Sequence, residues 1–200
     1  MKYPNHSEKT FQNNISYGNR GMHLENDLNA TNEYYRTNNI AVIYKKPTPI
    51  TINKVDYPNR LDAVIKEAHF KIPSTTDYNG IYKGKYIDFE AKETKLKSFP
   101  LSNIHKHQLE HLAKIVEHGG IGFVIVSFTL FNEVYLLPAS DILTYVEETN
   151  KKSIPITFFK EKGFMINYNY NPRLDYLKII DKIYFKGEVA WRIFLRTEIT

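Results

Sequence analysis

Three residues of the chain form the pattern Asp-x12-Glu-x-Lys, which combines two acidic side chains with one cation: Asp77, Glu90 and Lys92. Mg²⁺ binds a few protein oxygens and takes its other ligands from water or substrate phosphates. A lysine beside such an ion lowers the pKa of an attacking water or stabilises the negative charge of a pentavalent phosphorane. These residue types are therefore those of metal-assisted phosphodiester hydrolysis.

The two segments that carry the pattern are predicted to pair as a β-hairpin. STTDYNGIY and KYIDFEAKET are rich in β-branched and aromatic residues, and a two-residue Lys-Gly turn separates them. If residues 82 and 85 close the turn, Asp77 faces Glu90 and Thr75 faces Lys92. Because side chains alternate along a strand, these four share one face, and the core face carries Ile87, Phe89 and Ala91. Two facing carboxylates repel each other, and a divalent cation relieves this repulsion.

The pattern alone favours a nuclease and a purely structural role equally. In the structural alternative, Asp77 and Asp88 are charges of a surface turn or strand edge. Glu90 and Lys92 then form a solvated ion pair that contributes at most about 1 kcal/mol to stability.

Composition limits the other chemistry that the chain can use. Two hundred residues predict one domain, and the N-terminal MKYPNHSEKTFQNN lacks the apolar block of a signal peptide, so we expect a cytoplasmic protein without a membrane span. The absence of cysteine excludes disulfides, a thiolate nucleophile and zinc sites with Cys ligands. One predicted helix carries three histidines, His105, His107 and His111. Only the last two share a face, so a structural or phosphate-binding role is favoured over zinc binding.

The charge distribution suits a polyanionic partner. Lys and Arg exceed Asp and Glu by 27 to 22, which gives a net charge of +5. Eight basic residues lie close to the acidic motif in the sequence: Lys83, Lys85, Lys92, Lys95, Lys97, His105, Lys106 and His107. Lys95, Lys97 and Lys106 flank the motif and have no place in the metal shell, so we expect them to contact DNA phosphates.

The hydrophobic pattern predicts an α/β fold in which a mixed sheet has helices on both sides. Helices are expected over residues 19–36, 103–118, 142–148 and 173–185, with Glu25 on the first helix and Gln108 on the second turn of the next. Strands are expected over residues 41–46, 50–55, 121–128 and 133–138, besides the hairpin. We expect residues 57–71, whose pattern is ambiguous, to form an extended and partly exposed element.

Asp-x12-Glu-x-Lys resembles the PD-(D/E)xK nuclease superfamily, and longer strings resemble one family within it, RecU. The strings NRGMHLENDLNATNEYY, AVIYKKPTPI, STTDYNGIYKGKYIDFEAKET, SFPLSNIHKHQLEH and PRLDYL follow in the family's order. The resemblance implies a restriction-endonuclease-like core and a Mg²⁺-dependent endonuclease that resolves Holliday junctions by paired symmetric nicks. It places the metal ligands at Thr75, Asp77, Glu90 and Gln108, the catalytic lysine at Lys92 and an auxiliary acidic residue at Glu25.

The resemblance also implies a homodimer and a stalk, about residues 45–71, that enters the centre of a four-way DNA junction. Candidate DNA contacts in or beside this stalk are Lys45, Lys46, Arg60 and Phe70. The strand-exchange recombinase and branch-migration proteins are implied as further partners. Residues 1–18 are expected to form a flexible arm, residues 19–185 the nuclease domain, and residues 186–200 an extension without an assigned role. The alternatives are a sequence-specific restriction or repair nuclease and a noncatalytic DNA-binding regulator of recombination.

Overall fold

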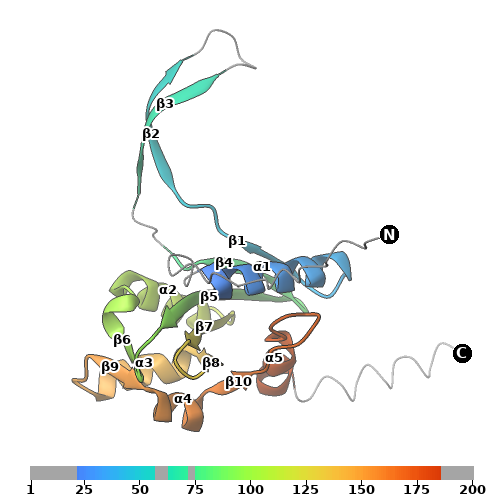
Figure 1. Cartoon of the computed structure of the whole chain (residues 1–200), viewed down its shortest axis with the longest axis vertical. Helices are drawn as coiled ribbons and strands as arrows, with labels where there is room; N and C mark the ends of the chain where they lie inside the picture. The colour runs from blue at the N-terminus through green and yellow to red at the C-terminus, as the bar shows by residue number, and fades with distance from the viewer. Residues whose placement is uncertain (1–21, 57–62, 72–74, 186–200) are drawn as a thin grey trace, which may run out of the picture.

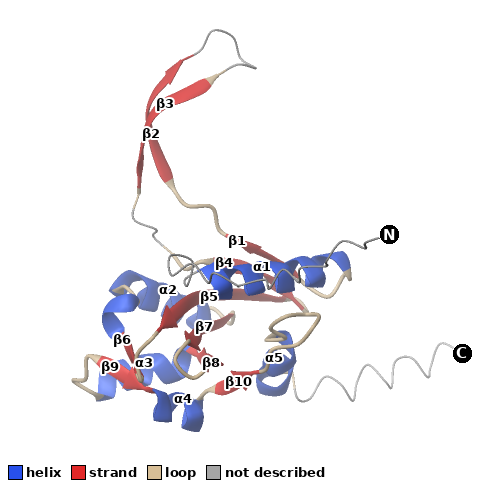
Figure 2. Ribbon diagram, viewed as in Figure 1, coloured by secondary structure: helices blue, strands red, loops and turns tan. Residues whose placement is uncertain are grey.

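One mixed β-sheet with helices on both faces forms the body of the protein, and a two-stranded hairpin projects from it (Figures 1 and 2). The computed structural model of the chain describes residues 22–56, 63–71 and 75–185. In spatial order the strands of the sheet are β1 (Val42–Lys45), β4 (Tyr78–Tyr82), β5 (Lys85–Thr94), β7 (Ile121–Phe128), β8 (Glu133–Pro138) and β10 (Phe164–Ile166). The central pair β5 and β7 is parallel, and the other pairs described in this sheet are antiparallel. This topology confirms the predicted mixed α/β class.

One face of the sheet packs against α1 (Met22–Thr37) and α5 (Leu177–Tyr184). The centre of this core is aromatic, since the fully buried ring of Phe89 stacks on Tyr78 and Phe123 with centroid distances of 4.8 and 4.7 Å. Residues at helical spacing on both helices complete the core with Leu24, Leu28, Tyr35, Leu177 and Ile180. Packing against this face holds the first turn of α1 close to the end of β5.

The opposite face packs against α2 (Lys106–Glu117), α3 (Ala139–Glu148) and α4 (Ile156–Lys162). Its buried side chains include Leu112, Val124, Val126, Leu137 and Phe159. Two short strands, β6 (Ser98–Pro100) and β9 (Ser153–Pro155), pair with each other beside this layer. Because β7 is covered on both faces, all eight of its residues are buried, which explains its continuous apolar sequence.

The β4–β5 hairpin has the register that the sequence predicts. Tyr78 pairs with Phe89 and Asn79 with Asp88, so Asp77 comes beside Glu90. The turn residues Lys83 and Gly84 both have positive φ angles, 48° and 76°, as a tight hairpin turn of this hand requires.

A long, exposed hairpin projects away from the body and corresponds to the predicted stalk (Figure 1). It consists of β2 (Ile50–Asp56) and β3 (Val64–Phe70), which pair in antiparallel fashion. Nearly every described side chain of the two strands is exposed, and the Phe70 side chain is 82% exposed. The expectation of an extended, exposed element is thus confirmed for residues 64–70. Residues 57–62, with Arg60, lie outside the described residues.

The remaining elements differ from the prediction mainly at their ends. The helix that carries Gln108 begins at Lys106 instead of residue 103, because a 3-10 turn (Leu101–Asn103) precedes it and His105 caps it. Gln108 therefore lies in the first turn, not the second. The short elements β6, β9, α4 and β10 had no clear periodicity in the sequence. The expected arm, residues 1–18, and the extension, residues 186–200, lie outside the described residues. No helix described here is long and apolar enough to cross a membrane.

Candidate active site

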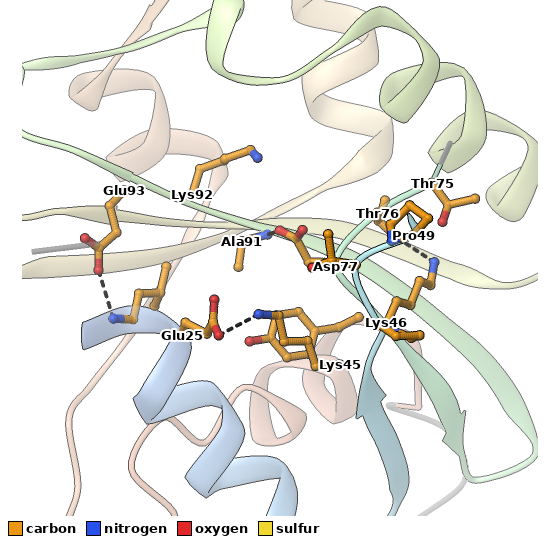
Figure 3. Close-up of a pocket in the computed structure, with 14 residues that line it drawn as sticks. Glu25, Lys45, Lys46, Pro49, Thr75, Thr76, Asp77, Ala91, Lys92 and Glu93 are labelled. Atoms are coloured by element: carbon orange, nitrogen blue, oxygen red, sulfur yellow. Dashed lines mark hydrogen bonds and ion pairs between the residues drawn. The ribbon is translucent and has the colours of Figure 1, made fainter. Parts of the chain in front are cut away.

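A cavity of about 460 Å³ opens where the start of α1, the base of the stalk and the β4–β5 hairpin meet (Figure 3). Six of the predicted site residues line it, together with Glu93, and they are Glu25, Lys45, Lys46, Thr75, Asp77 and Lys92. The hairpin supplies the acidic motif, whereas the helix and the stalk base supply side chains from distant parts of the sequence. The cavity is therefore the place where the predicted site is assembled.

Glu90 lies beside this cavity and is completely buried. One of its oxygens, Oε1, contacts Lys92 Nζ at 2.6 Å and accepts a hydrogen bond from Gln108 Nε2 at 2.7 Å. The other oxygen, Oε2, is buried and has no hydrogen-bond partner. A buried carboxylate oxygen without a partner is unfavourable unless a cation or a proton occupies the position next to it.

The electrostatics of Glu90 agree with this geometry. Burial and, to a smaller extent, the negative charge of Asp77 raise the pKa of Glu90 to about 7, although the neighbouring Lys92 lowers it. Asp77 lies close enough to Glu90 to raise its pKa, and two carboxylates this close can bind the same cation. The predicted repulsion between Asp77 and Glu90 is therefore present.

Main-chain contacts fix Asp77 at the entrance to β4. Its Oδ2 accepts a hydrogen bond from the Ala91 N–H at 3.2 Å, and its carbonyl accepts one from the Lys46 N–H at 2.7 Å. The alternation of faces stops here, because β4 begins at Tyr78. Strict alternation would point Thr76 to the sheet face opposite to that of Glu90. Its hydroxyl instead donates to Asp88, which lies on the same face of β5 as Glu90.

The donor set fits a hard divalent cation that keeps part of its hydration. Asp77 and the unpartnered Oε2 of Glu90 provide carboxylate oxygens, and Thr75 lines the same cavity. Gln108 is already engaged at both ends of its amide, because its Oε1 accepts the His105 N–H at 2.9 Å while its Nε2 donates to Glu90. Within the described residues no group of three or more His, Cys, Asp or Glu side chains could hold a metal. Two carboxylates with water and substrate oxygens are sufficient for Mg²⁺.

The first turn of α1 brings Glu25 to the cavity, and Glu93 near the end of β5 lies beside this turn. Glu25 forms an ion pair with Lys45 at 2.5 Å, and the Glu93 carboxylate accepts a hydrogen bond from the Leu24 N–H at 2.8 Å. Glu25 is thus placed at the cavity as expected. Glu93 was not predicted as a site residue, although it directly follows the Glu-x-Lys motif.

The structural alternative for Asp88 is wrong, because this side chain is completely buried and is no surface charge. Asp88 contacts Lys46 Nζ at 2.9 Å and accepts a hydrogen bond from the Tyr86 hydroxyl at 3.0 Å. His111 Nε2 lies 3.2 Å from the same carboxylate. The position of Asp88, two residues before Glu90 on one strand, could have indicated this shared face.

The other predicted DNA contacts lie away from the carboxylates. Lys95, Lys97 and Lys106 are exposed, and Lys106 forms an ion pair with Glu110 at 3.2 Å. Phe70 is exposed on the stalk. Lys45 and Lys46, in contrast, are held in ion pairs within the protein.

Comparison with known proteins gives consistent matches over most of the chain. The family model described as RecU, Recombination protein U, matches residues 19–182. A protein of Geobacillus sp. strain WCH70 named Holliday junction resolvase RecU is 57% identical over 188 residues, which cover 92% of each chain. A Bacillus cereus protein of the same name is 54% identical over 197 residues, covering 92% of this chain and 98% of the other. The solved structure of the Holliday junction resolvase Hjc from Archaeoglobus fulgidus covers 72% of this chain and 94% of its own, with 14% identity and a TM-score of 0.44.

Proposed function

The chain belongs to the RecU family, and from this premise we propose that it is an endonuclease that resolves Holliday junctions by paired symmetric nicks. The observation that carries the proposal is the environment of the buried Glu90, which lies beside Asp77. One oxygen of Glu90 contacts Lys92 and Gln108, and the other has no hydrogen-bond partner. This arrangement fits metal-assisted hydrolysis of a phosphodiester.

We assign Mg²⁺ as the cofactor, held by Asp77 and Glu90, with Thr75 and Gln108 as the other candidate ligands. When bound, such an ion lowers the pKa of an attacking water and offsets negative charge on the phosphate. The Gln108 amide orients the Glu90 carboxylate by donating to Oε1, which leaves Oε2 without a hydrogen-bond partner.

Lys92 is assigned to the charge that develops on the phosphate during cleavage. Its ammonium contacts the Glu90 carboxylate, and the residue lines the open cavity in which we propose that the scissile phosphate binds. A preorganised cation at this position stabilises the transition state more than the ground state. We assign Glu25, which lines the same cavity, to the orientation of the attacking water.

Paired nicks require two active sites in a two-fold relation, which a homodimer provides. We propose that the exposed stalk enters the open centre of the junction and that Lys95, Lys97 and Lys106 bind the DNA backbone. We place the protein in the cytoplasm with its DNA substrate. The strand-exchange recombinase and branch-migration proteins are proposed as partners on the strength of the family alone.

A cleavage assay tests this proposal. The full-length protein is incubated with a mobile four-way junction or with a linear duplex of matching sequence, in Mg²⁺ or in EDTA. We expect symmetric nicks in the junction only, and only with Mg²⁺. Equal cleavage of both substrates would indicate a sequence-specific or repair nuclease, and binding without cleavage would indicate a noncatalytic regulator.

A further inference from the structure

Asp88 is a buried carboxylate that the proposed chemistry does not use. It lies in the middle of β5 and is 0% exposed, two residues from Glu90. Its Oδ1 accepts a hydrogen bond from the Thr76 hydroxyl, and its Oδ2 accepts one from the Tyr86 hydroxyl at 3.0 Å. Lys46 Nζ contacts Oδ2 at 2.9 Å and also donates to Thr76 Oγ1 at 2.9 Å. A buried charge is retained at little cost in stability only when it is paired in this way.

Two of these partners stand at the two ends of the stalk. Lys46 immediately follows β1, where the chain leaves the body, and Thr76 lies where the chain has returned and β4 is about to begin. We call these two residues the stalk foot. Asp88 is therefore the point in the body to which both ends of the stalk are joined.

The stalk foot also determines where Asp77 lies. Thr76 precedes Asp77 in the chain, and the Lys46 N–H donates to the Asp77 carbonyl at 2.7 Å. On the side of β5, Asp77 has the 3.2 Å hydrogen bond from Ala91. A shift of the stalk foot consequently displaces Asp77 relative to Glu90.

We propose that Asp88 is a positioning residue that fixes the stalk foot, and through it Asp77, in the geometry needed for cleavage. This inference rests on the proposed nuclease function and deepens it. Asp88 acts through Lys46 and Thr76 and does not contact the DNA or the metal. Its charge is the essential property, because Lys46 is attracted by the carboxylate whereas the two hydroxyl groups need only an acceptor oxygen.

The variant that removes this charge with the smallest change of shape is Asp88→Asn. The amide has nearly the same size, but it loses the attraction for Lys46 and keeps an acceptor oxygen for only one of the two hydroxyl groups. We expect single-turnover cleavage at saturating junction to fall about 10- to 100-fold, as expected for a small misplacement of a reacting group. The Kd for the junction should change by less than about threefold, because the exposed DNA-binding lysines are untouched.

Asp181→Asn provides a matched control. Asp181 also binds a lysine and a tyrosine hydroxyl, with Lys83 Nζ at 2.5 Å and the Tyr82 hydroxyl at 3.0 Å. These contacts lie at the turn of the β4–β5 hairpin, at the end opposite to Asp77. This variant should cleave bound junction at the wild-type rate even if its melting temperature falls as much as that of Asp88→Asn.

Lys46→Gln and the double variant test whether the two charges act together. If Lys46 and Asp88 act as one unit, the double variant should cleave no more slowly than the slower single variant. Losses that multiply would contradict the proposed link. Should Asp88→Asn fail to fold, Lys46→Gln at the edge of the cavity removes the same ion pair, and wild-type cleavage of bound junction by it would overturn the proposal.

The wild-type protein separates this inference from the proposed function. If the wild type does not cleave junctions, the proposed function fails. If the wild type cleaves and folded Asp88→Asn cleaves bound junction at the same rate, only the positioning role fails. A loss confined to junction binding would likewise contradict it.

Discussion

Replacing Glu90 by Gln removes one carboxylate from the proposed site and keeps nearly the same shape. The glutamine Oε1 can still accept the hydrogen bond from Gln108, and the variant carries no charge at this position at any pH. The perturbation therefore tests whether the metal-free protein is destabilised by a buried, repelled carboxylate.

The magnitude follows from the pKa. Burial and the neighbouring Asp77 raise the pKa of Glu90 from 4.5 to about 7. The folded protein thus holds this proton more tightly than the unfolded chain, and the resulting stabilisation is complete below pH 4.5 and is lost as the pH rises to 7. Between pH 5 and pH 8 the wild type should lose about 2 to 3 kcal/mol of unfolding free energy relative to Glu90→Gln.

The assay is urea unfolding in EDTA at pH 5 and pH 8, at one protein concentration because a dimer makes stability concentration-dependent. The quantity of interest is the difference in unfolding free energy between the two proteins at each pH, since titrating groups that do not interact with Glu90 cancel in it. Adding Mg²⁺ at pH 8 should restore the stability of the wild type and leave that of Glu90→Gln nearly unchanged.

Glu110→Gln is the control, because Glu110 lies exposed on α2 and its change should leave the pH profile of the wild type unaltered. Parallel pH profiles of the wild type and Glu90→Gln would refute the reasoning. They would mean that the Glu90 carboxylate is hydrated, or that Asp77 lies too far away to repel it.

Three further predictions concern Lys92, the exposed lysines and the stalk. Lys92→Ala should lower single-turnover cleavage of bound junction by at least about 100-fold with little change in Kd, and a main effect on Kd would move Lys92 to the phosphate-binding lysines. Replacing Lys95, Lys97 and Lys106 by Gln should instead reduce the slope of log K against log salt by about two to three, measured by titration at several salt concentrations, and an unchanged slope would contradict their assignment. Replacing residues 47–70 by a short linker should weaken binding to the junction more than to a duplex in gel-shift assays; equal losses would argue against a stalk that selects junctions.

The sequence was sufficient to predict the hairpin and the side chains that it aligns. Once the Lys83-Gly84 turn was recognised, the side-chain period of two determined which residues face Glu90, and the pairing of Asn79 with Asp88 confirms that register. The central strand β7 was equally evident, because a strand buried on both faces must be apolar throughout.

Contacts between distant segments could not be predicted in this way. Nothing near Lys46 in the sequence indicates that it pairs with a residue 42 positions later, and the contact of the buried Asp88 with His111 of α2 is equally distant in the sequence. The role of Gln108 changed for a local reason, since its helix begins later than the periodicity indicated and its amide caps the first turn. Long-range packing thus determines which acidic residues are buried.

The most direct test of the central claim is single-turnover cleavage of a mobile four-way junction by Asp77→Asn in Mg²⁺, with junction binding measured on the same preparation. The proposed site requires Asp77 beside Glu90, so cleavage should be abolished while the Kd for the junction stays near that of the wild type. Cleavage at the wild-type rate by folded, junction-bound Asp77→Asn would contradict the assignment of this site.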